Sequence, residues 1–305
     1  MPSFPLREPG WPADAEFGEF RGVIGSNEWG TYCRLERRYP GKLVWPAARG
    51  KLPAALELVS GVGPRIAARL RAQGYWSLTD LCRHPRFGAD ASRVLAALEA
   101  GRWKTLLERG ADEGEVLAAL PAEKVAFLDL ETCGLGSTLP LFLVGFLRWR
   151  GDGGSGGSWE LTQLLARDYD EEAAVLDALA EELAGLWGIV SYNGRAFDQH
   201  YALDRAAVHQ VGLEFGQLHF DLLKHARHHY RGVLPNCRLG TVEQAVLGRL
   251  RAEEADGGEI PELYHRFVQT RDPGIMAAIL RHNASDLRAL AELVWLVERD
   301  GGERW

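Results

Sequence analysis

The sequence has 305 residues, of which 46% are apolar and 25% are charged, and its formal net charge is −7. This length and composition exclude a disordered chain and allow one or two domains with packed cores. The acidic balance excludes a uniformly basic nucleic-acid-binding protein, so a polyanionic partner would need a local basic patch.

Residues 1–50 are rich in Pro, Gly and Trp and show little periodicity, so we expect an extended N-terminal arm. Within it, residues 23–40 are predicted to form a short hairpin, and Trp11, Trp29 and Trp45 would pack the arm on the rest of the chain. The start of the sequence has no apolar signal-peptide core, and no apolar run reaches about 18 residues. We therefore expect a cytoplasmic protein with no membrane span and with reduced cysteines.

Residues 51–115 are predicted to form a small all-α domain. Between residues 50 and 110, ten Lys and Arg residues stand against five Asp and Glu residues, a net charge of +5. A basic segment inside an acidic chain indicates a module with its own partner. The segment 109–116, which contains glycines and acidic residues, would link this module to the next domain.

The stretch "LVSGVGPRIAARL" is the most specific feature of this module. Gly61 and Gly63 permit a tight turn, and Pro64 suits the first turn of a following helix, whose exposed N–H groups could hold a phosphate. Arg65 and Arg69 add positive charge beside them. The stretch resembles a helix-hairpin-helix motif, which implies DNA binding through the backbone, while an αα-hairpin used only for packing is the alternative. Four apolar residues would pack the helices together: Val62, Ile66, Leu70 and Leu78.

Residues 120–300 show alternating strand and helix patterns. We expect strands at 124–131, 139–150, 159–166 and 188–194, helices at 170–187, 197–211 and 273–300, and a strand that runs into a helix at 218–230. The segment 151–158 is made of Gly, Ser and Asp and is predicted to be a flexible hairpin loop. This order predicts an α/β domain with a mixed sheet flanked by helices.

Acidic side chains lie where several of these elements begin or end. Asp129 and Glu131 end an apolar strand, and their spacing directs both carboxylates to one face. Asp198 starts a helix after another strand, and His282 and Asp286 share one face of the last helix. Because open α/β sheets hold ligands at the carboxyl ends of their strands, we expect these residues to converge there. Like charges placed together repel unless a cation neutralises them.

Each of these features has a simpler interpretation when taken alone. An Asp-x-Glu pair often lies on a solvated edge, and Asp198 would suit a helix N-terminus. His282 and Asp286 would form a surface pair worth a few tenths of a kcal/mol. The ordered combination favours a functional site.

The combination resembles the DEDD exonuclease superfamily, and the segments "HFDLLKHAR", "CRLGTVEQAVLG" and "GGEIPELYHRF" are similar to its YprB-like ribonuclease H-like subgroup. The first motif is matched by "DLETCGL", the second by "YNGRAFD" with Asn193 and Asp198, and the third by "HNASD". The resemblance covers residues 124–297. Histidine-dependent members usually place the histidine five residues before the last aspartate, whereas His282 lies four residues before Asp286.

The resemblance implies a ribonuclease H-like fold and a two-metal mechanism with Mg²⁺ or Mn²⁺. It implies that four carboxylates hold the two ions and that His282 is the general base. Thr132, Leu135 and Asn193 match positions near the terminal nucleotide. The alternatives are core packing for Leu135 and turn hydrogen bonds for the other two. The metal-ligating residues implied by the family are Asp129, Glu131, Asp198 and Asp286.

Other polar residues of this domain are given structural interpretations. Asp221 ends a strand, and we expect it to cap the following helix rather than to bind a metal. His225, His228 and His229 are expected to form a solvated, basic face, although two of them have a metal-capable spacing.

The sequence thus predicts a metal-dependent 3′→5′ exonuclease, whose polarity is implied by the resemblance. Single-stranded DNA is the expected substrate because of the hairpin module, and RNA remains open. The alternatives are a non-catalytic nucleic-acid-binding protein that keeps the fold and a structure-specific endonuclease. The sequence indicates no oligomeric state.

Overall fold

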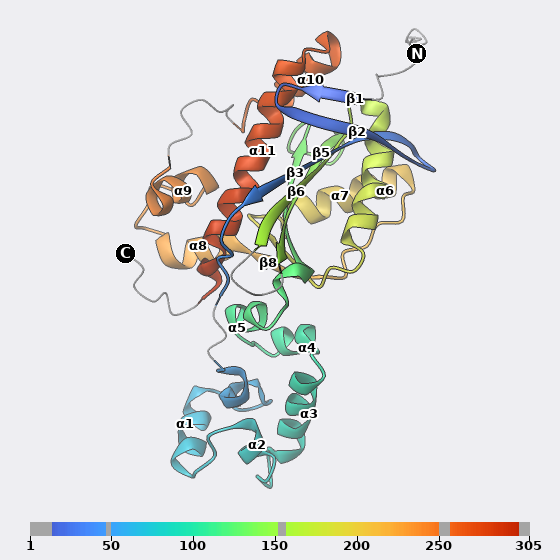
Figure 1. Cartoon of the computed structure of the whole chain (residues 1–305). Coiled ribbons are helices and arrows are strands. Elements are labelled where there is room, and N and C mark those ends of the chain that lie inside the picture. Colours follow the sequence, from blue (N-terminus) through green and yellow to red (C-terminus); the bar gives the residue numbers. More distant parts are fainter. Residues whose placement is uncertain (1–13, 47–49, 152–156, 250–256, 299–305) are drawn as a thin grey trace.

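The computed structural model describes residues 14–46, 50–151, 157–249 and 257–298. One eight-stranded sheet forms its centre, with the strand order β1-β2-β3-β6-β5-β4-β7-β8 (Figure 1). The strands are β1 (Asp14–Phe17), β2 (Phe20–Asn27), β3 (Gly30–Pro40), β4 (Val125–Thr132), β5 (Leu141–Gly151), β6 (Gly157–Leu165), β7 (Gly188–Ser191) and β8 (Leu218–Asp221). The β4–β7 and β7–β8 pairs are parallel and the others are antiparallel, so the predicted mixed sheet is confirmed.

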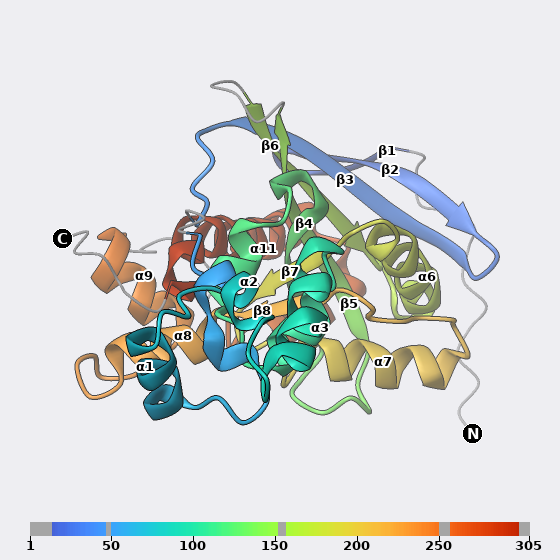
Figure 2. The same cartoon turned by 90° about the horizontal axis from the view of Figure 1, so that it is seen from below.

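Helices cover both faces of this sheet. The helices α6 and α7 lie on one face, and the long helix α11 crosses the other face, where it packs on β4 and β5 (Figures 1 and 2). The helices of this part are α6 (Glu172–Leu183), α7 (Asp198–His209), α8 (Leu222–Tyr230), α9 (Leu239–Leu247), α10 (Ile260–Thr270) and α11 (Pro273–Leu293). Short 3₁₀ turns, η3 (Ala122–Lys124), η4 (Tyr169–Glu171) and η5 (Val294–Val297), flank them. In the described part of the chain, no helix is both long and apolar enough to cross a membrane.

Residues 14–40 differ from the extended arm that the composition suggested. The hairpin β2–β3 exists as expected, but β3 pairs with β6 from Cys33↔Leu165 to Pro40↔Ser158. These N-terminal strands therefore belong to the central sheet. The physical reason is that β6 would otherwise expose a row of unpaired backbone groups, which β3 satisfies.

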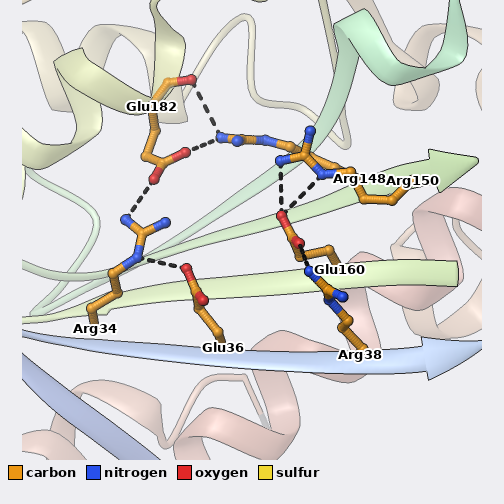
Figure 3. Close-up of polar contacts among 7 residues, drawn as sticks. All are labelled: Arg34, Glu36, Arg38, Arg148, Arg150, Glu160 and Glu182. Carbon is orange, nitrogen blue, oxygen red and sulfur yellow. Dashed lines mark hydrogen bonds and ion pairs between the residues drawn. The ribbon is translucent and has the colours of Figure 1, made fainter.

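Ion pairs connect β3 to its neighbours across the sheet. Glu182 of α6 accepts hydrogen bonds from Arg34 at 2.5 Å and from Arg148 of β5 (Figure 3). Glu160 of β6 pairs with Arg150 at 2.8 Å and with Arg38 at 3.4 Å. In each network a single glutamate pairs with one arginine of β3 and one arginine of β5. The networks therefore favour a β3 strand within the sheet over a detached arm.

The helical part at residues 52–118 lies at one end of the sheet (Figure 1). It contains α1 (Pro64–Ala72), α2 (Leu78–Leu81), α3 (Gly88–Glu99), α4 (Trp103–Glu108) and α5 (Glu113–Ala118), with the 3₁₀ turns η1 (Leu52–Ala54) and η2 (Leu56–Leu58) before them. Val62, Leu70 and Leu78 are buried in one cluster, as expected, and Ile66 packs against it. The same cluster continues through Val116 of α5 into the core under α11. The two parts therefore share a hydrophobic core.

Candidate active site

The strand β4 positions the first two carboxylates. Its residues alternate between the faces, so Asp129 and Glu131 follow Val125 and Phe127 on the side of α11. Pairing between β4 and β7 ends at Phe127↔Val190. The carboxyl end of β4 therefore extends beyond β7 and leaves room for the turn that follows β7.

A buried amide pair holds Asp129 in place. The Asn283 side chain donates from Nδ2 to Asp129 Oδ2 at 2.9 Å and accepts from Gln163 Nε2 at 2.9 Å. Gly145 lies opposite Asp129, and a Cβ atom there would come within 2.2 Å of Asn283 Oδ1. Our sequence reasoning missed these three residues. The only local signal was that Asn283 lies between His282 and Asp286 in "HNASD".

The turn between β7 and α7 contains Asn193 and leads to Asp198, the first residue of α7. Asn193 has a positive φ of 67°, and its backbone N–H donates to Asp221 Oδ1 at 2.8 Å. The Arg195 N–H donates to the other oxygen of Asp221 at 3.3 Å. Asp221 also accepts from Leu223 N, so the predicted helix cap is confirmed and has a second role in fixing this turn.

The helix α11 brings His282 and Asp286 to the same region. The His282 Nε2 atom lies 3.5 Å from Asp286 Oδ2, as expected for residues one turn apart. His282 is buried, and its Nδ1 atom has no hydrogen-bond partner among the described residues. The pair is therefore not a solvated surface pair.

Electrostatics shows that the four carboxylates form one cluster. Burial, followed by repulsion from Asp286, Glu131 and Asp198, raises the pKa of Asp129 well above its ordinary range. Burial, followed by repulsion from Asp286 and Asp198, does the same to the pKa of Glu131. Burial also raises the pKa of Asp198 to about 7, although backbone hydrogen bonds from Asp198 itself and from Leu130 oppose this shift. Ionised carboxylates in this cluster destabilise one another in the absence of a cation.

The donor set fits hard divalent cations. Among the described residues, no group of three or more His, Cys, Asp or Glu side chains is arranged so that it could hold a metal ion as it stands. The cluster nevertheless supplies only oxygen donors, which Mg²⁺ and Mn²⁺ prefer. The Glu131 Oε1 atom is buried without a hydrogen-bond partner in the described part of the chain. A buried, unsatisfied carboxylate oxygen beside other carboxylates is the chemistry that a bound cation would satisfy.

Two residues that follow the first motif have different environments. Thr132 is buried and donates from Oγ1 to Gly134 O at 2.8 Å, which matches the turn hydrogen bond given as its alternative. Leu135 is 91% exposed, so the alternative of core packing is wrong. An exposed leucine on the loop after β4 is available to contact a ligand.

The proposed DNA-binding residues of the hairpin lie elsewhere. Gly61 has a φ of +80°, which favours glycine, and Gly63 is the N-cap of α1 with no side-chain cap. Arg65 and Arg69 are exposed and have no ion-pair partner within the described ranges. The helix α1 lies at the far end of the helical part, away from the carboxylate cluster (Figures 1 and 2). The structure therefore presents two separate candidate regions.

The expectation of a solvated histidine face is wrong for His225. This residue is buried, and its Nε2 atom lies 2.6 Å from Glu113 Oε2 at the start of α5. Lys224 also pairs with Glu113, at 2.9 Å, and Arg195 lies 4.0 Å from it. This ion-pair group ties the helical part to the turn that precedes Asp198, which no local sequence pattern indicated.

The sheet domain is similar to known proteins. A family model described as the RNase_H superfamily matches residues 126–297. Over 173 residues the chain is 33% identical to the uncharacterized protein YprB of Bacillus subtilis (strain 168), an alignment that covers 55% of this chain and 40% of that protein. The chain thus spans less than half the length of this curated relative. A solved family B DNA polymerase from the hyperthermophilic archaeon Pyrobaculum calidifontis is 18% identical and has a TM-score of 0.44, with coverage of 56% of this chain and 24% of the polymerase.

Proposed function

The chain belongs to the RNase_H superfamily, and on that basis we propose that it is a metal-dependent 3′→5′ exonuclease of the DEDD type. Single-stranded DNA is the proposed substrate, and two ions, Mg²⁺ or Mn²⁺, are the proposed cofactors. The observation that carries the proposal is the carboxylate cluster around Asp129, in which burial, followed by repulsion among the acidic groups, raises the pKa values of Asp129 and Glu131. A fold that retains such a cluster without using it would be destabilised at neutral pH.

The proposed ligands come from three regions of the chain. Asp129, Glu131, Asp198 and Asp286 would hold the ions. When bound, the ions would supply activation of a water molecule and neutralisation of charge on the phosphate and leaving oxygen. Asn283 holds the Asp129 carboxylate in one orientation, so this ligand needs little reorganisation.

His282 is the proposed general base. Its imidazole is buried beside Asp286, which restrains the ring through the 3.5 Å contact at Nε2. A histidine can accept the proton of the attacking water near neutral pH. Thr132 ends β4, and Leu135 and Asn193 lie on the loops that follow β4 and β7 at the same end of the sheet. All three are proposed to contact the terminal nucleotide.

The helix-hairpin-helix interpretation is proposed for the helical part. The uncapped N-terminus of α1, with Gly61 and Gly63 before it, has free N–H groups suited to a DNA phosphate. Arg65→Ala and Arg69→Ala should each remove one phosphate contact. Each variant should then reduce the slope of log DNA affinity against log salt concentration by about one unit. Arg93→Ala is the control, because this exposed arginine of α3 is paired with Asp90. Equal effects of all three variants would contradict the assignment.

A digestion ladder tests the catalytic proposal. Single-stranded DNA and matched RNA, labelled at the 5′ end, are incubated with Mg²⁺ or Mn²⁺ and with wild type, Asp129→Asn, His282→Gln or Asp204→Asn. Asp204 is an exposed residue of α7 outside the cluster, and its carboxylate accepts a hydrogen bond from Ser137 Oγ at 2.7 Å. Because an asparagine oxygen can keep this hydrogen bond, Asp204→Asn serves as the matched control. We expect products that shorten one nucleotide at a time, lost with EDTA and with Asp129→Asn and strongly reduced with His282→Gln.

Other patterns would identify other functions. Internal fragments in place of a ladder would indicate an endonuclease. Binding of both strands without metal-dependent cleavage would indicate a non-catalytic nucleic-acid-binding protein. Preferential shortening of RNA would indicate that RNA, and not DNA, is the substrate.

A further inference from the structure

A cavity of about 810 Å³ lies between the helical part and the sheet domain. One wall is the α3–α4 corner, with Arg102, Trp103 and Lys104, and the other is formed by the loops before β7 and β8, with Trp187 and Gln217. Its volume is within the range of ligand-binding pockets. None of these residues belongs to the carboxylate cluster or to the hairpin before α1.

Trp187 gives this cavity a rigid aromatic wall. Its side chain is 49% exposed, although a tryptophan usually buries most of its surface. Its backbone is fixed on both sides, because Trp187 N donates to Lys124 O at 2.7 Å and Trp187 O accepts from Leu218 N at 2.9 Å. The indole is therefore exposed on a backbone that is held by two neighbouring elements.

Gln217 forms a fixed part of the cavity wall. Its Nε2 donates to Leu183 O at 2.8 Å, which fixes the amide. Its Oε1 atom is buried, so this amide shapes the wall and does not present its oxygen to a ligand in the cavity.

The charge of the cavity favours an anion. Arg102 and Lys104 are both exposed, and within the described ranges neither is placed in an ion pair. Glu99 is the acidic residue among those that line the cavity. An exposed aromatic ring beside unpaired cations is the combination that binds single-stranded nucleic acid, since bases stack on the ring and phosphates pair with the cations.

The cavity is distinct from the cleavage site. The Trp187 backbone is hydrogen-bonded to Lys124, the residue just before β4. Asp129 lies five residues after Lys124 along the chain. At about 3.3 Å per strand residue, the two positions are roughly 16 Å apart along the strand. A nucleotide in the cavity would therefore be a different one from the nucleotide held at the carboxylates.

We propose that this cavity binds a nucleotide unit of single-stranded nucleic acid, with a base stacked on Trp187 and a phosphate held by Arg102 and Lys104. The inference takes its ligand class from the proposed function. It adds a second anchoring point for the unpaired strand, between the helical part and the sheet domain.

Binding without metal tests the inference separately from catalysis. The affinity of the full chain for a labelled single strand of about 16 nucleotides, and for the matching duplex, is measured by fluorescence anisotropy in EDTA. The variants are Trp187→Ala, Trp187→Phe, Arg102→Ala with Lys104→Ala, and Val208→Ala as the control. Val208 of α7 is also highly exposed, at 63%, but lies outside the cavity and outside the helical part.

We expect Trp187→Ala to weaken single-strand binding at least about fivefold, with little change for the duplex, because a paired base cannot stack on the ring. Trp187→Phe should recover part of the affinity, the double variant should weaken binding and flatten its salt dependence, and Val208→Ala should bind as wild type. Unchanged affinity in Trp187→Ala, or an equal loss in Val208→Ala, would overturn the inference. If wild type fails to cleave but Trp187-dependent binding is found, the proposed function fails and the inference stands. Urea midpoints equal to wild type would show that the variants are folded.

Discussion

Replacing Asp198 by asparagine should stabilise the metal-free protein, and more so at pH 8 than at pH 5. The pKa of the Asp198 carboxyl is raised from its ordinary value of 3.8 to about 7, mainly by burial. The folded state therefore binds this proton more tightly than the unfolded state. Stability falls as pH rises between the two pKa values, and the penalty is fully present above the folded value.

The magnitude follows from the shift. A difference of roughly three pKa units, at about 1.36 kcal/mol each, corresponds to about 4 kcal/mol at pH 8. At pH 5, which lies only about one unit above the ordinary pKa of 3.8, the destabilisation by Asp198 is roughly 1.5 kcal/mol. Asparagine cannot ionise and keeps one oxygen for the backbone hydrogen bonds. The stabilisation by Asp198→Asn should thus be larger at pH 8 than at pH 5 by about 2–3 kcal/mol.

Urea unfolding followed by tryptophan fluorescence, in EDTA at both pH values, measures this difference. The matched control is Asp204→Asn, an exposed residue on the same helix, which should show no such pH dependence. Adding Mg²⁺ or Mn²⁺ at pH 8 should stabilise wild type more than Asp198→Asn, because a proposed ligand is lost. If Asp198→Asn changed stability equally at both pH values, or destabilised the protein at pH 8, the inferred cost of burying an ionised Asp198 carboxylate would be refuted.

Three further substitutions separate stability from activity. Glu182→Ala should lower the free energy of unfolding, measured with urea, by about 3–5 kcal/mol, because it leaves the buried Arg148 of β5 without its carboxylate partner. A loss below about 1 kcal/mol would contradict this reasoning. Gly145→Ala should displace Asn283, because Asn283 Oδ1 would lie 2.2 Å from the new Cβ. This substitution should lower the free energy of unfolding by about 1–3 kcal/mol and should also slow the nuclease reaction. Gly212→Ala, with open space around it, is its control and should change neither. Leu135→Ala removes a 91% exposed side chain, so the urea midpoint should stay the same while single-turnover cleavage slows; an unchanged rate would remove this residue from the proposed nucleotide contacts.

Much of the sheet domain could be predicted from local patterns. The expected strand at 124–131 corresponds to β4, and the expected helix at 197–211 corresponds to α7. These elements have strong apolar periodicity and clear boundaries, which act over a few residues. The strands β1–β3 were not recognised as part of the sheet, because they join it through β3, whose partner β6 lies more than a hundred residues away in sequence. Such long-range pairing leaves no period in the segment itself.

The surroundings of the candidate site were less predictable than its acidic residues. Asn283 acts on Asp129, and Gln163 acts on Asn283, only because α11 packs across β4 and β5 and reaches the Gln163 side chain of β6. His225 looked like part of a solvated face, yet its partner Glu113 comes from a different part of the chain. Pairs of this kind depend on which helix covers which strand, and each partner alone is an ordinary polar residue.

The sequence by itself determined which short elements form and where the carboxylates lie along them, because alternation, helical spacing and turn residues act locally. Only the tertiary structure decided that Asp129, Glu131, Asp198 and Asp286 repel one another and that a cavity opens beside Trp187. Electrostatic repulsion and cavity volume depend on distances between segments far apart in the chain. Those distances are set by how helices pack on the sheet, for which a single sequence carries no local signal.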